Sequence, residues 1–320
     1  MINSARQRVL DLEKLAEEGQ FLEKPTSVWR NALRRLLRRK IAIAGLSIIG
    51  FWVLVAILAP LIATHDPNRG LLGQPGITRR DPPCIHALGC SPEKPQHILG
   101  LDGNARDEFS RIVYGTRISL TIGITTVTVA ILVGAALGAM AGYWGGWADN
   151  LIMRVLDVIL GFPALLLAIA IVAVLPGPPG LTKALLAIAI VTIPQYARVM
   201  RASVLQIKEL DFVAASRALG ASSWRILFTR VIPNALTPLV VLGTLGIAGA
   251  ILEAAGLGFL GVGAQPPTPE WGTMLSEERN QLFSAPHLVF FPGLAIMLVV
   301  LGFNLLGDGL RDALDPRLND

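Results

Sequence analysis

Charged residues are scarce in this sequence. Asp, Glu, Lys and Arg together make up only 16% of its 320 residues, whereas hydrophobic residues make up 52%. The mean hydropathy is +0.57, and an average soluble domain carries about 25% charged residues. This balance excludes an ordinary soluble domain. Long apolar runs favour helices that cross a bilayer, so the sequence predicts an all-α, polytopic membrane protein.

The sequence also lacks the motifs of a nucleotide-binding or metal-binding protein. No GxxxxGK[ST] motif occurs, so the chain has no visible phosphate cradle. Its two cysteines, Cys84 and Cys90, cannot form a four-ligand metal site by themselves. The histidines are scattered over predicted outer segments, which argues against a metal site within this chain: His65, His86, His97 and His287. We therefore expect no catalytic, cofactor-binding or metal site here.

Two further classes of protein are excluded by where the charges and the first apolar run lie. The formal net charge of +5 could indicate nucleic-acid binding. However, the basic residues cluster beside apolar runs and are not interleaved with aromatics, which favours a membrane over a nucleic acid as the partner. The first apolar run begins only at Ile41 and no small-residue cleavage site follows it, so we expect no cleaved secretory signal.

Six apolar stretches predict six transmembrane helices. They cover residues 41–63, 118–143, 158–175, 184–197, 235–252 and 288–306. A crossing helix needs about 20 residues. The fourth stretch has fewer, so we expect it to cross only if Lys183 and Arg198 at its ends extend towards the two interfaces. The third contains Pro163, where a kink is expected.

The distribution of charge predicts which segments face the cytoplasm. The N-terminal segment 1–40 is amphipathic and then basic, and it ends in six cations without an acid: Arg30, Arg34, Arg35, Arg38, Arg39 and Lys40. By the positive-inside rule, both the N-terminus and, after six crossings, the tail at 307–320 are cytoplasmic. Segment 198–233 then lies inside, and segments 64–117 and 263–287 lie outside.

Small residues and charges near the spans suggest local contacts. Gly134, Gly138 and Gly142 recur on one helix face, and this spacing favours close helix packing over a catalytic role. Arg154 and Asp157 lie three residues apart at the predicted inner end of the third span. We expect Asp157 to pair with Arg154 or with the tail.

Three outer or near-outer residues leave alternatives open. Cys84 and Cys90 face an oxidising compartment in this topology and are expected to form a disulfide rather than remain free thiols. Glu253 is the one acid in the apolar run around the fifth span. An acid inside a membrane can serve a proton or a substrate amine, but its position near the outer end favours a structural or interfacial role.

Residues 209–233 form a polar, cationic stretch between apolar runs. Asp211 is predicted to cap a short helix, and Gly220 suits the position just past its end. Phe212, Ala215 and Leu219 fall on one face of that helix. The helix is too short to cross a bilayer, and Ser222 can cap a second helix after it. We interpret the stretch as a surface that another protein grips.

Four stretches, taken together, resemble the C-type permease subunits of the dipeptide, oligopeptide and nickel ABC importers. Residues 97–120 read HILGLDGNARDEFSRIVYGTRISL, which is similar to the family signature HPLGTDxxGRDxxSRxxYGxRxSL. Leu101 and Ala105 replace its usual Thr and Gly. Residues 256–275 read GLGFLGVGAQPPTPEWGTML and resemble the family loop after the fifth span. Residues 307–320 read GDGLRDALDPRLND and resemble its cytoplasmic tail.

The fourth stretch is similar to the family's EAA loop, which reads EAAxxxG, nine residues and then IxLP. Ala215, Gly220 and Pro233 match that pattern. The remaining positions differ: Ala214 stands where the usual Glu lies, Ser216 replaces Ala, Arg230 stands at the usual Ile and Ile232 replaces Leu. The resemblance therefore implies ATPase-coupling roles for the following residues: Asp211, Phe212, Ala214, Ala215, Ser216, Leu219, Gly220 and Pro233.

The resemblance implies a type I ABC importer permease in the plasma membrane of a prokaryote. Its expected partners are a second, B-type permease, two cytoplasmic ATPase subunits that bind ATP and Mg, and an extracytoplasmic substrate-binding protein. Peptides are the expected substrates, with nickel, glutathione or oligosaccharides as alternatives within the family. The competing interpretation is a self-sufficient secondary transporter or channel. It would need charged or broken helices at mid-bilayer, and the spans are almost uncharged there.

Overall fold

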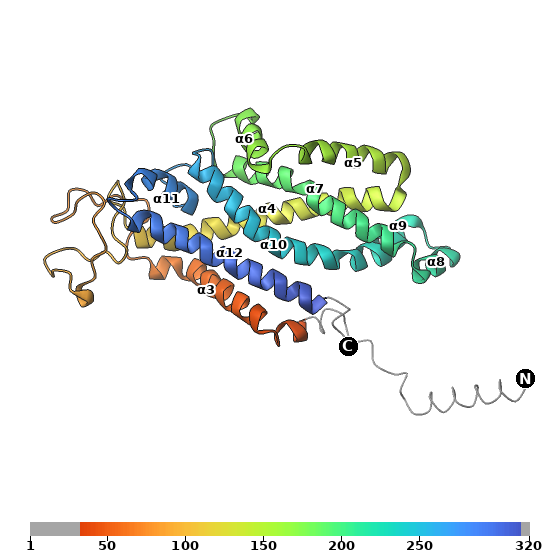
Figure 1. The fold of residues 1–320 in the computed structure, drawn as a ribbon, viewed down its shortest axis with the longest axis horizontal. Coiled ribbons are helices and arrows are strands. Elements are labelled where there is room, and N and C mark those ends of the chain that lie inside the picture. Colours follow the sequence, from red (N-terminus) through yellow and green to blue (C-terminus); the bar gives the residue numbers. More distant parts are fainter. Residues whose placement is uncertain (1–32, 315–320) are drawn as a thin grey trace, which may run out of the picture.

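The apolar runs of the sequence fold into long α-helices (Figure 1). The computed structural model describes residues 33–314. Within that range, 5 helices are long and apolar enough to cross a membrane, or up to 6 spans if a bent helix pair is one more. The long helices are α3 Lys40–Ile62, α4 Glu108–Trp144, α7 Leu181–Ile207, α10 Ile232–Phe259 and α12 His287–Leu314. The predicted all-α membrane architecture is confirmed at this level.

The predicted third span, residues 158–175, is not one helix. Helices α5 Gly146–Leu160 and α6 Ala164–Val174 are bent by 97° at a short break. Pro163 lies in that break and has no N–H to continue the helical hydrogen bonds, so the expected kink is a full interruption. The 11 residues of α6 rise about 16 Å, which is too short to cross a core of about 30 Å alone.

Two other helices extend beyond their predicted spans. α4 begins at Glu108 rather than at residue 118, because the Asp107 side chain accepts a hydrogen bond from the Ser110 backbone N–H and caps the helix there. α12 continues through Leu314, so the first part of the predicted tail is helical. The predicted amphipathic segment at 1–24 and the last tail residues, 315–320, lie outside the described residues.

The predicted fourth span, 184–197, is too short by almost half. α7 has 27 residues and crosses without any need for its ends to stretch. The prediction stopped at Arg198 because it treated the charge as a boundary. In the structure that charge is paired, since Arg198 Nη2 lies 2.5 Å from Asp157 Oδ1 on α5. The predicted pairing of Asp157 with Arg154 or with the tail is therefore wrong.

The glycine face of α4 packs directly against α7. A Cβ atom added at Gly138 would lie 2.2 Å from the Ala197 carbonyl oxygen, and one added at Gly134 would lie 2.8 Å from Tyr196 Cβ. A Cβ atom added at Gly142 would lie 2.9 Å from the Arg201 carbonyl oxygen. Only a hydrogen fits at these contacts, so the predicted close packing of this face is confirmed.

Apolar packing joins the helices around α4 and α10. One buried cluster, between α4, α7 and α10, includes Ile122, Tyr196 and Leu257. A second, between α3, α10, α11 and α12, includes Trp52 and Trp271. The short helix α11 comprises Trp271–Glu278. α3 also leaves large apolar side chains exposed along its length, as expected for a helix that faces lipid or another membrane subunit.

The two ends of the bundle carry different segments (Figure 1). The short helices α8 Asp211–Ala218 and α9 Ser223–Ile226 lie at one end, together with the start of α3 and the end of α12. The loop before α4 and the helix α11 lie at the opposite end. This arrangement separates segment 198–233 from segments 64–117 and 263–287 along the bundle. Which end faces the cytoplasm stays a prediction from the charges.

Candidate functional site

The short helix α8 projects from one end of the bundle (Figure 1). Its N-cap is Leu210 in an extended conformation, with no side-chain cap hydrogen bond. The prediction that Asp211 caps this helix is therefore wrong. Asp211 is instead the first helical residue, where its carboxylate lies near the positive end of the helix dipole. The local stabilisation is electrostatic rather than a specific cap contact.

The C-terminal end of α8 is tightly closed. Gly220 has φ +80°, a left-handed conformation that glycine adopts without steric cost. The Gly220 N–H donates to the Arg217 carbonyl at 3.0 Å, and the Ala221 N–H donates to the Ser216 carbonyl at 3.1 Å. These two bonds are the pair that defines a Schellman motif. Gly220 thus occupies the predicted position and ends α8 sharply.

Most of α8 faces away from the bundle. Val213 is fully buried in a cluster with Met200 and Ile226, and it anchors the helix. By contrast, Phe212 is 40% exposed and Leu219 is 89% exposed. Ala214 and Ala215 are exposed as well. The predicted face of Phe212, Ala215 and Leu219 is therefore free of contacts that would bury it within this chain.

A groove of about 520 Å³ lies between α8 and the helices that follow it. Ser222 caps α9 by accepting a hydrogen bond from the Arg225 N–H at 3.4 Å. A five-residue π-helical segment, η2 Leu227–Val231, then leads into α10, whose first turn contains Pro233. The groove lining is mixed polar and apolar: Ser216, Leu219, Gly220, Ala221, Arg225, Ile226, Thr229 and Arg230.

A buried network of ion pairs holds the opposite end of the bundle. Arg106 contacts Asp102 at 2.5 Å and Glu277 at 2.8 Å, and its own side chain is 5% exposed. Arg111 contacts the same Glu277 at 3.2 Å. Glu278, the next residue, accepts hydrogen bonds from Arg80 at 2.8 Å and from the Gly103 N–H at 2.7 Å. The network therefore connects the loop before α4 with α11.

Sequence reasoning missed this network. Apart from Arg80, its residues stand in the 97–120 signature and just after the 256–275 loop, and the alternating acids and bases of DGNARDEFSR were the available signal. The same two stretches also meet through Trp271, which is fully buried and donates its indole N–H to the Ile112 carbonyl at 3.1 Å. Two of the four motifs that carry the family resemblance are thus neighbours in space.

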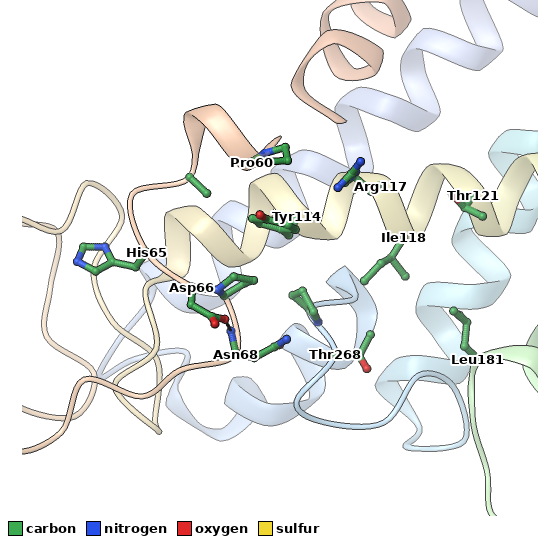
Figure 2. A pocket seen from close by; sticks show the side chains of 13 residues that line it. Pro60, His65, Asp66, Asn68, Tyr114, Arg117, Ile118, Thr121, Leu181 and Thr268 are labelled. Atoms are coloured by element: carbon green, nitrogen blue, oxygen red, sulfur yellow. Dashed lines mark hydrogen bonds between the residues drawn. The ribbon is translucent and has the colours of Figure 1, made fainter. Parts of the chain in front are cut away.

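A cavity of about 730 Å³ opens beside this network, at the first half of α4. Figure 2 shows that its walls come from α4, from the end of α3 and the segment after it, from the loop with Thr268, and from the start of α7. Its charged members are Asp66 and Arg117. The remaining lining is largely apolar or neutral: Pro60, Ala63, His65, Pro67, Asn68, Tyr114, Ile118, Thr121, Leu181, Thr268 and Pro269.

The disulfide Cys84–Cys90 and the acid Glu253 occupy separate places in the fold. Cys84 and Cys90 form a disulfide with their Cα atoms 5.4 Å apart. Cys84 also exchanges two backbone hydrogen bonds with His97, at 2.8 and 3.0 Å, so the disulfide loop is attached to the segment before α4. Glu253 is partly buried on α10 and makes no hydrogen bond or ion pair with any described residue.

Two of the four histidines are not scattered. His65 and His97 lie with their ring centroids 5.2 Å apart, and both rings approach Asp107 Oδ1. Burial acts to raise the pKa of Asp107, but hydrogen bonds from His97, Ser110 and Thr64 outweigh that effect and lower the pKa. The prediction of dispersed histidines is therefore wrong for this pair, because the loop after α3 returns to the start of α4.

Comparison with protein families gives two matches. A model described as "Binding-protein-dependent transport system inner membrane component" matches residues 130–320. A second, described as the N-terminal TM domain of oligopeptide transport permease C, matches residues 27–83.

Curated relatives match along most of the chain. The dipeptide transport system permease protein of Alkalihalophilus pseudofirmus is 48% identical over 297 residues, which cover 91% of each chain. The glutathione transport system permease protein of Pectobacterium atrosepticum is 43% identical, again over 91% of each chain. The dipeptide permease of Haemophilus influenzae is 47% identical over 87% of this chain and 90% of its own length.

A solved structure shares the fold. A chain of the MetNI methionine ABC transporter, in an inward-facing conformation, superposes with a TM-score of 0.52 and 18% sequence identity. The match covers 64% of this chain and 97% of that chain.

Proposed function

This chain belongs to the family of inner membrane components of binding-protein-dependent transport systems, and on that premise we propose that it forms half of the translocation pathway of a peptide importer. It is a multi-pass permease subunit of a bacterial ABC importer, and a permease of this kind works with ATPase and other subunits. The proposal extends to which partners bind, where they bind and what is carried.

Helix α8 is proposed to dock in a cytoplasmic ATPase subunit. The observation that carries this assignment is a short helix whose ends are fixed while its outer face is bare. Val213 anchors it, the Gly220 turn ends it, and Phe212 and Leu219 remain exposed. A rigid, attached helix transmits a displacement of the ATPase to α7 and α10, which it connects. ATP and Mg belong to that partner.

The neighbouring permease and the binding protein complete the proposed assembly. A B-type permease supplies the other half of the pathway, against apolar side chains that this chain leaves exposed. An extracytoplasmic binding protein delivers substrate to the end with α11. In this assignment the N-terminus and the end of α12 are cytoplasmic, which agrees with the cations Arg34, Arg35, Arg38 and Arg39 before α3.

Small peptides are the proposed substrates. Two of the relatives above are dipeptide permeases at 47–48% identity, whereas the glutathione permease is 43% identical. The outer cavity supports this choice, because about 730 Å³ is in the usual range for small-ligand pockets. Asp66 and Arg117 offer opposite charges to the amino and carboxyl groups of a peptide. Glutathione, itself a peptide, is the second candidate.

Reconstitution tests the proposal. The chain, its B-type partner, the ATPase subunits and the binding protein would be incorporated in proteoliposomes, and uptake of a labelled dipeptide would be followed with and without ATP. We expect uptake only with ATP and with all subunits present, and competition by unlabelled dipeptide at lower concentration than by glutathione. Transport by this chain alone, without ATPase subunits, would instead establish a secondary transporter or channel.

A further inference from the structure

We propose that His65, His97 and Asp107 form a binding site for a divalent transition-metal cation such as Zn²⁺ at the outer end of α4. One ligand atom from each residue lies within 4.8 Å of the other two. His97 Nδ1 is 3.2 Å and His65 Nδ1 is 3.9 Å from Asp107 Oδ1. Ligand atoms around a tetrahedral Zn²⁺ lie about 3.3–3.5 Å apart, so only a small movement of His65 is needed.

The two oxygens of Asp107 have separate surroundings. Oδ2 accepts hydrogen bonds from Thr64 Oγ1 at 3.0 Å, from the Ser110 N–H at 2.9 Å and from Ser110 Oγ at 2.6 Å. These donors orient the carboxylate and cap α4. Oδ1 faces the two imidazole rings instead. A carboxylate held through one oxygen, with the other directed at two histidines, is the arrangement of a supported monodentate metal ligand.

The buried His97 ring presents only one of its two nitrogens to the cluster. The His97 side chain is 4% exposed, and its Nε2 has no hydrogen-bond partner among the described residues. Nε2 lies on the opposite edge of the ring from Nδ1, so a cation held by Nδ1 and Asp107 Oδ1 would leave Nε2 outside the site. His65 is 33% exposed, so a metal and a fourth ligand from solvent can reach it.

Imidazole and carboxylate donors favour Zn²⁺ and similar cations over Mg²⁺ or Ca²⁺, which prefer oxygen ligands throughout. The site would join three segments that the sequence separates. His65 follows α3, His97 is paired through its backbone with Cys84 of the disulfide, and Asp107 begins α4. His65 also lines the outer cavity, so a bound cation would fix one wall of it. This inference does not depend on which substrate is transported.

Metal titration of the purified, EDTA-treated complex tests the proposal. Zn²⁺ binding would be measured by calorimetry, and Co²⁺ would be used as a spectroscopic probe whose visible absorption reports nitrogen and oxygen ligands. We expect one saturable site in the parent, and in His65→Ala an affinity for Zn²⁺ that is lower by at least about 100-fold. Even the loss of a group behind a ligand commonly costs about 10- to 100-fold.

The variants separate a metal site from a hydrogen-bonded helix cap. His65→Asp keeps a ligand and should retain measurable binding, whereas His86→Ala removes an exposed histidine of the same loop and should bind like the parent. His65 is partly exposed, so its replacement should leave the complex folded. Equal Zn²⁺ affinity in the parent and His65→Ala, or no saturable binding in the parent, would overturn the proposal and leave the cluster as a cap only.

Discussion

The two ends of this molecule hold their surface segments by different means. At the end with α11, the loop before α4 is fixed by buried ion pairs, by a disulfide and by the capped start of α4. At the other end, α8 has one fully buried side chain, Val213, and among the described residues it makes no ion pair. The first end is held by contacts between described residues of this chain. The second presents an exposed face, on which we propose that a partner docks.

The two ends differ in how readily a bound partner could displace them. A loop fixed by many buried contacts resists displacement, so binding there selects a shape that already exists. A short helix attached at its two ends and bare on its outer face transmits displacement from whatever grips it. The assignment of coupling to α8 and of substrate entry to the α11 end follows this contrast.

The largest effect, a loss of ATP-driven uptake, is expected for Gly220→Pro. Proline fixes φ near −65° and lacks an N–H, so it is incompatible with φ +80° and removes the bond to Arg217. The end of α8 should be lost, and with it ATP-driven uptake, while membrane insertion and assembly of the spans remain. Gly220→Asn is the matched control, because Asn tolerates the left-handed region. Uptake by Gly220→Pro equal to that of the control would contradict a coupling role.

The next largest effect, a loss of stability, is expected for Arg106→Met at the opposite end. The substitution removes one of the two cations that Asp102 and Glu277 share and leaves only Arg111, at 3.5 and 3.2 Å, beside the buried Asp102 and its partner. Removal of one partner from a buried ion pair costs about 3–5 kcal/mol. Thermal unfolding in detergent should show a clear decrease in stability. Arg79→Met changes an exposed arginine of the same loop and should have little effect. Equal stability of the two variants would mean that the network does not hold this end.

Loss of the disulfide is expected to lower stability less than loss of the Arg106 ion pairs. Replacement of both Cys84 and Cys90 by Ser should lower the stability of the outer loop by about 2 kcal/mol, because the loop that the disulfide closes is short. Limited proteolysis of the complex should then cleave this loop faster. Mass spectrometry with and without reductant checks the premise. Two alkylatable thiols in the untreated parent would show that the cysteines are free.

The smallest effect concerns Glu270, which caps α11 through the backbone N–H groups of Gly272 and Thr273 at 2.9 and 2.8 Å. Loss of this cap in Glu270→Ala should cost about 0.5–2 kcal/mol. Glu270→Gln keeps an acceptor and should cost less. The comparison is made by thermal unfolding of the complex.

The same residue predicts a pH dependence. Burial raises the pKa of Glu270, and hydrogen bonds from Gly272 and Thr273 oppose it without cancelling it. The folded state therefore favours the protonated acid, and the contribution of Glu270 to stability falls as pH rises from its ordinary value near 4.5 through the raised folded value. Relative to the parent, Glu270→Gln should gain stability over that interval. A constant difference between the two proteins across it would contradict the raised pKa.

Local features of the fold could be predicted from the sequence. The apolar runs predicted the helices, and the glycines of α4 predicted its contact with α7. Gly220 predicted the end of α8. Each depends on neighbouring residues and on the properties of one side chain. Helix ends were less predictable, since Arg198 continues α7 by pairing with a residue of another helix.

Contacts between distant segments could not be predicted in this way. Arg106 and Glu277 are 171 residues apart, and their pairing depends on how α11 folds back over the start of α4. The approach of His65 to His97 depends in the same way on the path of the loop after α3. Pro163 indicated an interruption, but the angle of 97° depends on the packing of α5 and α6.

The most direct test of the central claim is ATP hydrolysis by the complete complex carrying Ala215→Asp. Ala215 is exposed on the outer face of α8, so the new charge should spoil docking without disturbing the spans. Ser223→Asp places the same charge at the exposed start of α9 and serves as the control. We predict that Ala215→Asp abolishes the substrate-stimulated ATP hydrolysis seen in the parent and the control. Normal stimulation in the Ala215→Asp complex would contradict the assignment of α8 as the coupling helix.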